Sequence, residues 1–174
     1  MCTPDRQEMI LFSDILGISA LVDAINNANS EAPAATESSV LGPFHNEANT
    51  FQNGDTITSS KASIGEPMLI QGIVLDIDGN SIKNALVDMW ETNGNGLYDM
   101  QDPHIEGPDC RGKVRTNSDG EFFLNGVRAV DYPIPSDGPV GVVMRVLNRS
   151  LYRPAHVVSA ESLLTTINDI RLIG

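Results

Sequence analysis

Two tyrosines and a histidine stand beside glycines and prolines in this chain, and together they could bind a metal ion. Tyr98 ends the stretch WETNGNGLY, Tyr132 opens YPIP, and His156 ends the run RPAH. Glycine and proline fix the direction of the backbone, so the side chains between them can be aimed. Two phenols and an imidazole that converge on one point suit a hard, oxidised metal such as ferric iron.

The composition limits the partners that we expect. The chain has 174 residues, which fits one domain or one domain with an appendage, and its 41% apolar content is enough for a core. A net charge of -12 argues against nucleic acid or an anionic membrane surface. No apolar run approaches transmembrane length. The acidic N-terminus is a poor signal peptide, and Cys2 and Cys110 form no disulfide framework or metal pattern, so we expect a cytoplasmic setting.

The elements that must position these residues begin with a helix. Apolar residues recur at steps of three and four from Ile10 to Ile25, which predicts one amphipathic helix over residues 5–26. Gly17 inside this helix lowers its stability and suggests close packing. We assign residues 1–30 to a helical segment that must pack on the following domain or on a second copy of the chain.

The remainder, residues 31–174, has the pattern of a mainly β domain. Residues 68–76 and 85–92 are predicted to form a hairpin about the Asp78–Gly79 turn, and residues 111–127 a second hairpin about Asp119–Gly120. Residues 138–147 could be a strand or a short helix, and the tail from residue 159 is equally ambiguous. Short strands with regular turn signals predict a β-sandwich.

The segment ATESSVLGPF, residues 35–44, lies before these strands and allows two interpretations. It is either a plain surface crossing or the wall of a pocket. The pocket-wall interpretation rests on Val40, Leu41 and Phe44, which require burial, and on the adjacent glycine and proline, which shape the backbone.

In this order, the segments resemble the intradiol ring-cleaving dioxygenases, the catechol and hydroxyquinol 1,2-dioxygenases. The matching pieces are ATESSVLGPF, GEPMLIQGIVLDIDGNSIKNALVDMWETNGNGLYD, RTNSDGEFFLNGVRAVDYPIPSDGPVG and YRPAHV. The resemblance covers most of residues 11–157. It implies a β-sandwich preceded by a helical segment that forms a homodimer, and a catalytic site that cleaves a small aromatic diol with O2.

The resemblance also implies roles for individual residues. Tyr98, Tyr132 and His156 would hold a non-haem Fe(3+) ion, and Arg153 would stabilise negative charge on the substrate ring. The residues expected to bind the substrate are Leu11, Asp14, Val40, Gly42, Pro43, Phe44, Ile134 and Pro135. A carboxylate at position 14 would accept a hydrogen bond from a third ring hydroxyl, although Asp14 facing solvent is an equally good interpretation.

The sequence departs from the family after His156. The family follows RPAH with one residue, a second histidine and an aromatic residue, whereas Val157 and Val158 stand here. We therefore expect three protein ligands, a chain truncated at both ends relative to the family, and a sandwich incomplete at its C-terminus. A catalytically dead binding and dimerisation module is the main alternative, and a secreted dioxygenase of the same fold is a weaker one.

Overall fold

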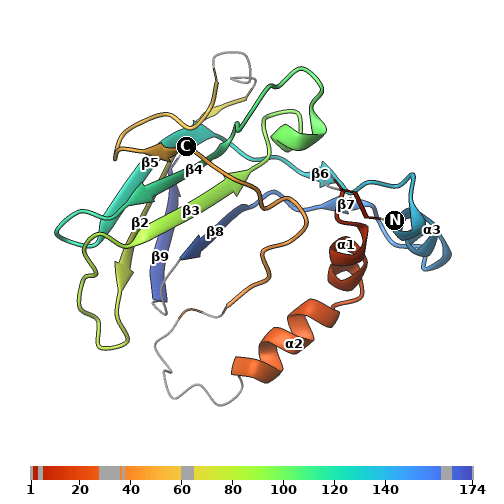
Figure 1. The fold of residues 1–174 in the computed structure, drawn as a ribbon, viewed down its shortest axis with the longest axis horizontal. Helices are drawn as coiled ribbons and strands as arrows, with labels where there is room; N and C mark the ends of the chain where they lie inside the picture. Colours follow the sequence, from red (N-terminus) through yellow and green to blue (C-terminus); the bar gives the residue numbers. More distant parts are fainter. Residues whose placement is uncertain are drawn as a thin grey trace.

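The fold is a β-sandwich with helices at one end. The computed structural model describes residues 2–3, 6–27, 36, 38–59, 65–161 and 166–173. One sheet has the strand order β1-β4-β3-β8 and the other β5-β2-β9, and β6 pairs with β7 separately (Figure 1). The strands are β1 (Thr50–Phe51), β2 (Pro67–Leu75), β3 (Leu86–Glu91), β4 (Arg111–Arg115), β5 (Glu121–Val127), β6 (Tyr132–Pro133), β7 (Tyr152–Arg153), β8 (Val157–Glu161) and β9 (Thr166–Ile173).

The core of the sandwich forms because each strand alternates buried and exposed side chains. In β5, Phe122 and Leu124 are buried while Phe123 points outward. They pack against side chains of the facing sheet, including Val87 and Val114. We call this cluster the sandwich core. It contains Ile57, Met68, Ile70, Val74, Ala85, Val87, Met89, Val114, Phe122 and Leu124.

The two predicted hairpins are wrong, although their turns are placed correctly. β2 pairs with β5 and β9, whereas β3 pairs with β4 and β8, so each predicted hairpin joins strands of different sheets. An Asp–Gly turn reverses the chain but does not choose the neighbour of the returning strand. Because both strands bury apolar side chains, the chain can cross to the facing sheet and still share one core.

The N-terminal helix differs from the prediction of one continuous element. Two helices, α1 (Glu8–Ile15) and α2 (Ile18–Asn27), are separated at Leu16 and Gly17. Gly17 has φ +74°, and a Cβ atom built on it would contact nothing within 4 Å. The glycine therefore provides a left-handed break in the helix, and the predicted close packing is absent there.

The ambiguous segments also have definite structures. Residues 139–146 form the helix α3 (Pro139–Val146), with a proline in its first turn. The described parts of the tail form β8 and β9, while residues 162–165 lie outside the described residues. A short 3-10 helix, η1 (Asp99–Gln101), follows β3. Within the described ranges, no helix has the length and apolar character needed to cross a membrane.

Candidate functional site

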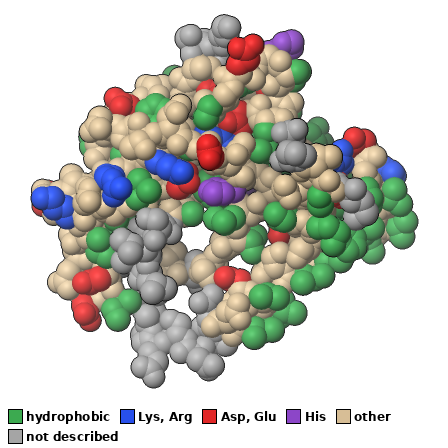
Figure 2. Space-filling view, viewed as in Figure 1, with side chains coloured by type: hydrophobic (Ala, Val, Ile, Leu, Met, Phe, Trp, Pro, Cys, Tyr) green, Lys and Arg blue, Asp and Glu red, His purple; other side chains and the backbone are tan. Residues whose placement is uncertain are grey.

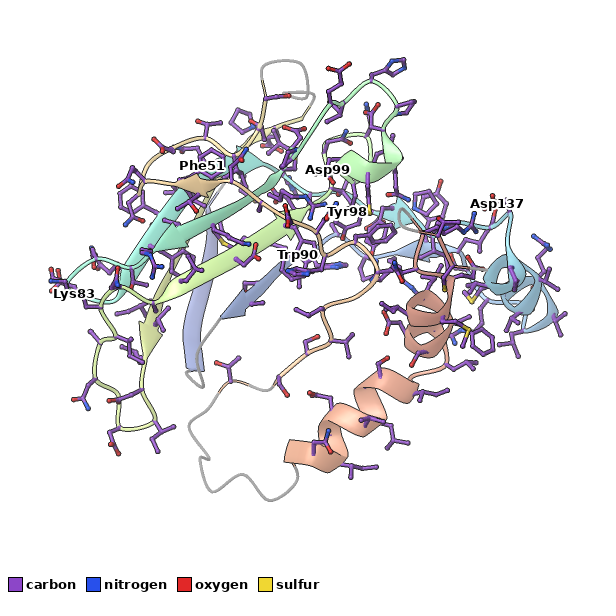
Figure 3. All side chains as sticks on the ribbon, in the orientation of Figure 1. Phe51, Lys83, Trp90, Tyr98, Asp99 and Asp137 are labelled. Carbon is purple, nitrogen blue, oxygen red and sulfur yellow. The ribbon has the colours of Figure 1, made fainter. Side chains whose placement is uncertain are left out.

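Tyr98 is presented by a tight loop at the end of β3. The side-chain oxygen of Asn93 accepts hydrogen bonds from the backbone N–H groups of Asn95 and Leu97, which fixes the loop. Gly96 has φ +76°, and a Cβ atom there would lie 2.7 Å from the carbonyl oxygen of Asp131. Only glycine allows this approach, which brings the segment of Tyr98 next to that of Tyr132. Figure 3 shows Tyr98 between the sheets and helix α1.

Tyr132 and His156 are held near each other by a second local structure. Tyr132 in β6 lies opposite Arg153 in β7, in antiparallel register. The carboxylate of Asp131 accepts a hydrogen bond of 2.9 Å from the backbone N–H of Ala155. Both contacts fix the RPAH run against the segment of Tyr132. The sequence-predicted metal ligands from three separate segments are thus neighbours in space.

The three rings form a compact group. The ring centroids of Tyr98 and Tyr132 are 5.2 Å apart, and those of Tyr132 and His156 are 5.5 Å apart. Phe44 stacks on Tyr98 with a centroid distance of 4.3 Å and an interplanar angle of 13°. Tyr98 and Tyr132 belong to a second apolar cluster, which we call the site cluster. It contains Leu11, Ile15, Phe44, Trp90, Tyr98, Tyr132, Ile134, Val140 and Met144.

The orientation of His156 leaves one ring nitrogen available. Nδ1 lies 2.8 Å from the carbonyl oxygen of Pro154. A carbonyl oxygen only accepts, so Nδ1 is the donor, and in the neutral ring Nε2 carries the free lone pair. Metal-binding histidines commonly have this arrangement, because the outer hydrogen bond fixes both tautomer and ring direction.

The electrostatics of the site oppose ionisation of either tyrosine when no cation is present. Burial raises the pKa of Tyr98, and the neighbouring Tyr132 raises it further. Burial also raises the pKa of Tyr132, although its hydrogen bond with Tyr98 and the charge of Arg153 act in the opposite direction. Phenolates at this position therefore need a strong local positive charge, which a trivalent cation supplies.

A cavity of about 160 Å³ is lined in part by Tyr132. This volume suffices for one aromatic ring, since an apolar cavity of roughly 150 Å³ holds benzene. Of the predicted substrate and catalytic residues, the structure places these in the lining: Leu11, Asp14, Pro43, Phe44, Ile134 and Arg153. Val40, Gly42 and Pro135 do not line it, and Leu41, expected to be buried, is 50% exposed.

Ile15 and Arg149 also line the cavity, and the sequence reasoning missed both. Arg149 donates a hydrogen bond of 2.8 Å to the carbonyl oxygen of Ile15 at the end of α1. The sequence contained a signal that Ile15 lines the cavity, because Ile15 lies one turn beyond Leu11 and next to Asp14 on the same helix. Arg149 had none, because no local pattern connects it with a helix that far away in sequence.

Asp14 lines the cavity, so it is not merely a solvent-facing residue. Its Oδ1 atom is buried and has no hydrogen-bond partner in the structure. Burial raises the pKa of this carboxyl, while a hydrogen bond with Ser19 and the charge of Arg153 lower it. A buried acceptor without a partner is costly, so this oxygen is available to a donor that enters the cavity.

The two valines after His156 point to opposite sides of β8. Val157 lies opposite Glu91 and packs against the sandwich core, whereas Val158 lies opposite Trp90 and packs against the site cluster. Position 158 therefore faces the site cluster, to which both tyrosines belong, but offers no donor atom. Across the described part of the chain, no group of three His, Cys, Asp or Glu residues could hold a metal ion.

The remaining histidines, His45 and His104, lie on the surface. His45 is exposed and its Nε2 lies 3.3 Å from a carboxylate oxygen of Asp88. His104 is exposed. Both cysteines are free, with Cys2 exposed and Cys110 buried.

Comparisons with known proteins agree with this architecture. A family model described as Dioxygenase matches residues 40–168, and one described as Catechol dioxygenase N terminus matches residues 1–33. The hydroxyquinol 1,2-dioxygenase of Rhizobium sp. (strain MTP-10005) is 44% identical over 98% of this chain and 58% of the relative. The 6-chlorohydroxyquinol 1,2-dioxygenase of Cupriavidus pinatubonensis is 39% identical over 90% of this chain and 56% of the relative.

A solved structure gives the same result. The hydroxyquinol 1,2-dioxygenase of Pseudomonas putida DLL-E4 superposes with a TM-score of 0.83 and 38% identity, covering 95% of this chain and 58% of that one. The chain thus spans just over half the length of the relatives that it matches. Most of its own length is matched in sequence and in fold, and the chain belongs to the intradiol ring-cleavage dioxygenase family.

Proposed function

We propose that this site binds non-haem ferric iron and a small aromatic diol, and that it cleaves the ring with O2 between the two hydroxylated carbons. The observation that carries the proposal is the group of Tyr98, Tyr132 and His156, with ring centroids 5.2 and 5.5 Å apart, beside a ring-sized cavity. Both atoms of the O2 molecule enter the ring-opened product, which is a dicarboxylic acid.

The donor set fits this ion. The two phenol oxygens and Nε2 of His156 would hold it, and hard phenolate oxygens favour the ferric state. When bound, the ion would supply the positive charge that keeps both phenols ionised and would activate the diol for reaction with O2. Burial raises the pKa of both tyrosines, so their ionisation at neutral pH requires the charge of such a cation.

The chain's own residues would bind and orient the ring. Leu11, Phe44 and Ile134 form apolar walls that exclude water and contact the ring faces. Arg153 faces the same cavity, and its permanent charge would stabilise negative charge that develops on the ring.

The test is to express the chain, add ferric iron and record both the visible spectrum and ring cleavage. Tyrosinate bound to ferric iron absorbs visible light, so the loaded protein should be coloured. Tyr98→Phe and Tyr132→Phe should each remove or shift the band. A wild-type protein that stays colourless and retains no iron after desalting would refute the metal assignment.

Within this function, we propose that Asp14 selects a ring with a third hydroxyl, that is, hydroxyquinol over catechol. The support is the unpartnered Oδ1 atom in the cavity wall. Asp14→Leu should lower kcat/KM for hydroxyquinol roughly 10- to 150-fold, since one hydrogen bond to a charged acceptor contributes about 1.5–3 kcal/mol. The same variant should leave kcat/KM for catechol unchanged or raised. An equal fall for both diols would contradict this role.

A second candidate is a β-sandwich module that has lost catalysis and retains binding. One observation favours it: Val158 faces the site cluster at the position where the family has a ligand histidine. Incubating the iron-loaded chain with hydroxyquinol and O2 separates the two candidates. Ring-opened product supports the enzyme, and tight diol binding without product supports the module.

We also propose a homodimer formed through the N-terminal helices, in a reducing compartment such as the cytosol. Apolar side chains remain exposed along α1 and α2, and Figure 2 shows hydrophobic side chains gathered over α2. They are Met9, Ile10, Leu16, Ile18, Leu21, Val22 and Ile25. Light scattering after gel filtration should give twice the chain mass, and Leu21→Asp with Ile25→Asp should give a monomer. The two unpaired cysteines support the compartment.

A further inference from the structure

We propose that Arg111 is a positioning residue for the metal-binding tyrosine Tyr98. It hydrogen-bonds to Asp99, the next residue in the chain, and to the backbone of Phe44, whose ring covers Tyr98. The inference rests on the proposed function, in which Tyr98 is a ligand. Arg111 lies in β4, does not line the cavity and is not among the residues that the sequence suggested.

The guanidinium of Arg111 is fully buried and makes three hydrogen bonds. Its Nε donates to Oδ2 of Asp99 at 2.6 Å, and its Nη2 donates to Oδ1 of the same carboxylate. Its Nη1 donates to the carbonyl oxygen of Phe44 at 3.1 Å. The side chains of Arg111 and Asp99 are only 1% and 5% exposed. A buried, bidentate pair of this kind has a fixed geometry, unlike an ion pair in solvent.

The Asp99 side of this network fixes the residue next to Tyr98. Besides Arg111, the Asp99 carboxylate accepts hydrogen bonds from the backbone N–H groups of Met100 and Asp109. Tyr98 itself donates its backbone N–H to the side chain of Gln101, in the turn that begins at Asp99. The direction of the Tyr98 side chain therefore depends on a turn that the guanidinium anchors. Figure 3 shows Asp99 directly beside Tyr98, on the side toward β4.

The hydrogen bond from Arg111 to Phe44 fixes the residue whose ring covers one face of Tyr98. The Phe44 ring stacks on the Tyr98 ring at 4.3 Å, and it meets the Tyr132 ring edge-on at 6.0 Å. Phe44 belongs to a segment without regular secondary structure, so the sheets do not fix its backbone. The bond from Arg111 supplies this missing constraint. The Arg111 side chain thus connects β4 to Phe44 and, through Asp99, to Tyr98, the two residues whose rings stack.

Lysine cannot replace arginine in this network. An ammonium group is a compact charge on a flexible chain and does not present the planar fork that contacts a carboxylate and a carbonyl together. Arg111→Lys therefore keeps the charge and removes the geometry. Asp99→Asn keeps the shape and weakens only the Asp99 side of the network, while the bond to Phe44 remains.

The experiment compares wild type with Arg111→Lys, Arg111→Met and Asp99→Asn. It measures ferric iron affinity, the visible band of the loaded protein, and amide hydrogen exchange of the iron-free protein. Partners that orient metal ligands typically change metal affinity by roughly 10–100-fold, and both Arg111 variants should lose affinity within this range. Exchange should accelerate in residues 40–46 and 96–101 in Arg111→Lys, and in residues 96–101 alone in Asp99→Asn.

The matched control is Val114→Ala, on the same strand but with its side chain in the sandwich core. It should lower the melting temperature while leaving iron affinity and exchange in both segments unchanged. If Arg111→Lys behaves like this control, Arg111 is merely structural and the inference is overturned. If wild type binds no iron, the proposed function fails, and the exchange data still decide whether Arg111 positions Tyr98. If Arg111→Met does not fold, Arg111→Lys and Asp99→Asn decide alone.

Discussion

The sandwich core and the site cluster are both buried, but they differ in the polar groups that they contain. All ten side chains of the sandwich core are apolar. The site cluster includes two phenols and borders a cavity whose wall carries the unpartnered Oδ1 of Asp14. A further buried polar group is the carboxyl of Glu91, whose side chain is 1% exposed.

The difference indicates which part of the molecule is shaped for stability and which for chemistry. Buried apolar surface stabilises the fold without requiring a partner. Buried polar atoms without partners cost free energy, and they remain where a ligand or reaction uses them. We therefore expect substitutions in the sandwich core to alter mainly folding, and substitutions in the site cluster to alter mainly binding.

The largest expected effect is on stability. Phe122→Ala removes a fully buried ring from the sandwich core and should lower the free energy of unfolding by about 3–5 kcal/mol. Denaturant titration measures this loss. Iron bound per folded molecule should not change, because the ring has no contact with the site cluster. A loss of iron affinity in the fraction that remains folded would show that the two clusters are not independent.

Tyr132→Phe should produce the opposite pattern. We expect it to lower ferric iron affinity at least about 100-fold, because the proposed metal-binding oxygen is lost and phenylalanine provides no donor. Stability of the iron-free protein should change by no more than about 1 kcal/mol, since the buried ring is kept. Equilibrium dialysis against ferric citrate and a thermal melt of the iron-free protein measure the two quantities. Unchanged iron affinity would remove Tyr132 from the metal site.

The two valines of β8 allow the sharpest comparison between the clusters. Val158→His places an imidazole on the side of the tyrosines and should raise ferric iron affinity about 10–100-fold. Val157→His places the same group in the sandwich core, where it should lower stability without improving iron binding. An equal effect of both substitutions on iron affinity would contradict the assignment of the two faces.

The last expected effect is a pH dependence of stability caused by Glu91. Burial raises the pKa of this carboxyl from an ordinary value near 4.5 to about 8. Between these pH values the unfolded chain has released its proton while the folded protein retains it. The contribution is therefore complete below about pH 4.5 and is lost as the pH rises toward 8, by up to about 1.4 kcal/mol per pH unit.

Glu91→Gln should flatten this slope in urea titrations at pH 5, 6, 7 and 8. Glu66→Gln is the control, because Glu66 is exposed and pairs only with Arg128 among the interactions described. Equal slopes for wild type and Glu91→Gln would mean that Glu91 is charged in the folded protein.

The sequence predicted local features of this molecule better than its connections. The strand positions and the Asp–Gly turns follow from alternation and turn chemistry, which act between near neighbours. The choice of sheet for β3 and β5 depends on contacts across the core, and no local pattern contains it. The break at Gly17 was detectable as a glycine in a helix, but its left-handed conformation was not.

The same limit applies to the site. Tyr98, Tyr132 and His156 were identified together only because their motifs occur in the order of a known family. Asp14 left two interpretations open at the sequence level, and a buried atom in the cavity wall now favours one of them. Arg149 and Arg111 gave no sequence signal, because each acts through a hydrogen bond to a backbone carbonyl far along the chain.

The left-handed turn at Gly17 has a consequence for how this segment can change. Of the two helices on either side of this turn, α1 contributes side chains to the cavity lining and α2 contributes none. Because a straight helix would couple the directions of both halves, the turn lets α2 take its own direction, although Ser19 of α2 still hydrogen-bonds to Asp14. In the proposed homodimer, mutations in α2 outside Ser19 would thus remodel subunit contacts over evolutionary time while the cavity wall is inherited intact.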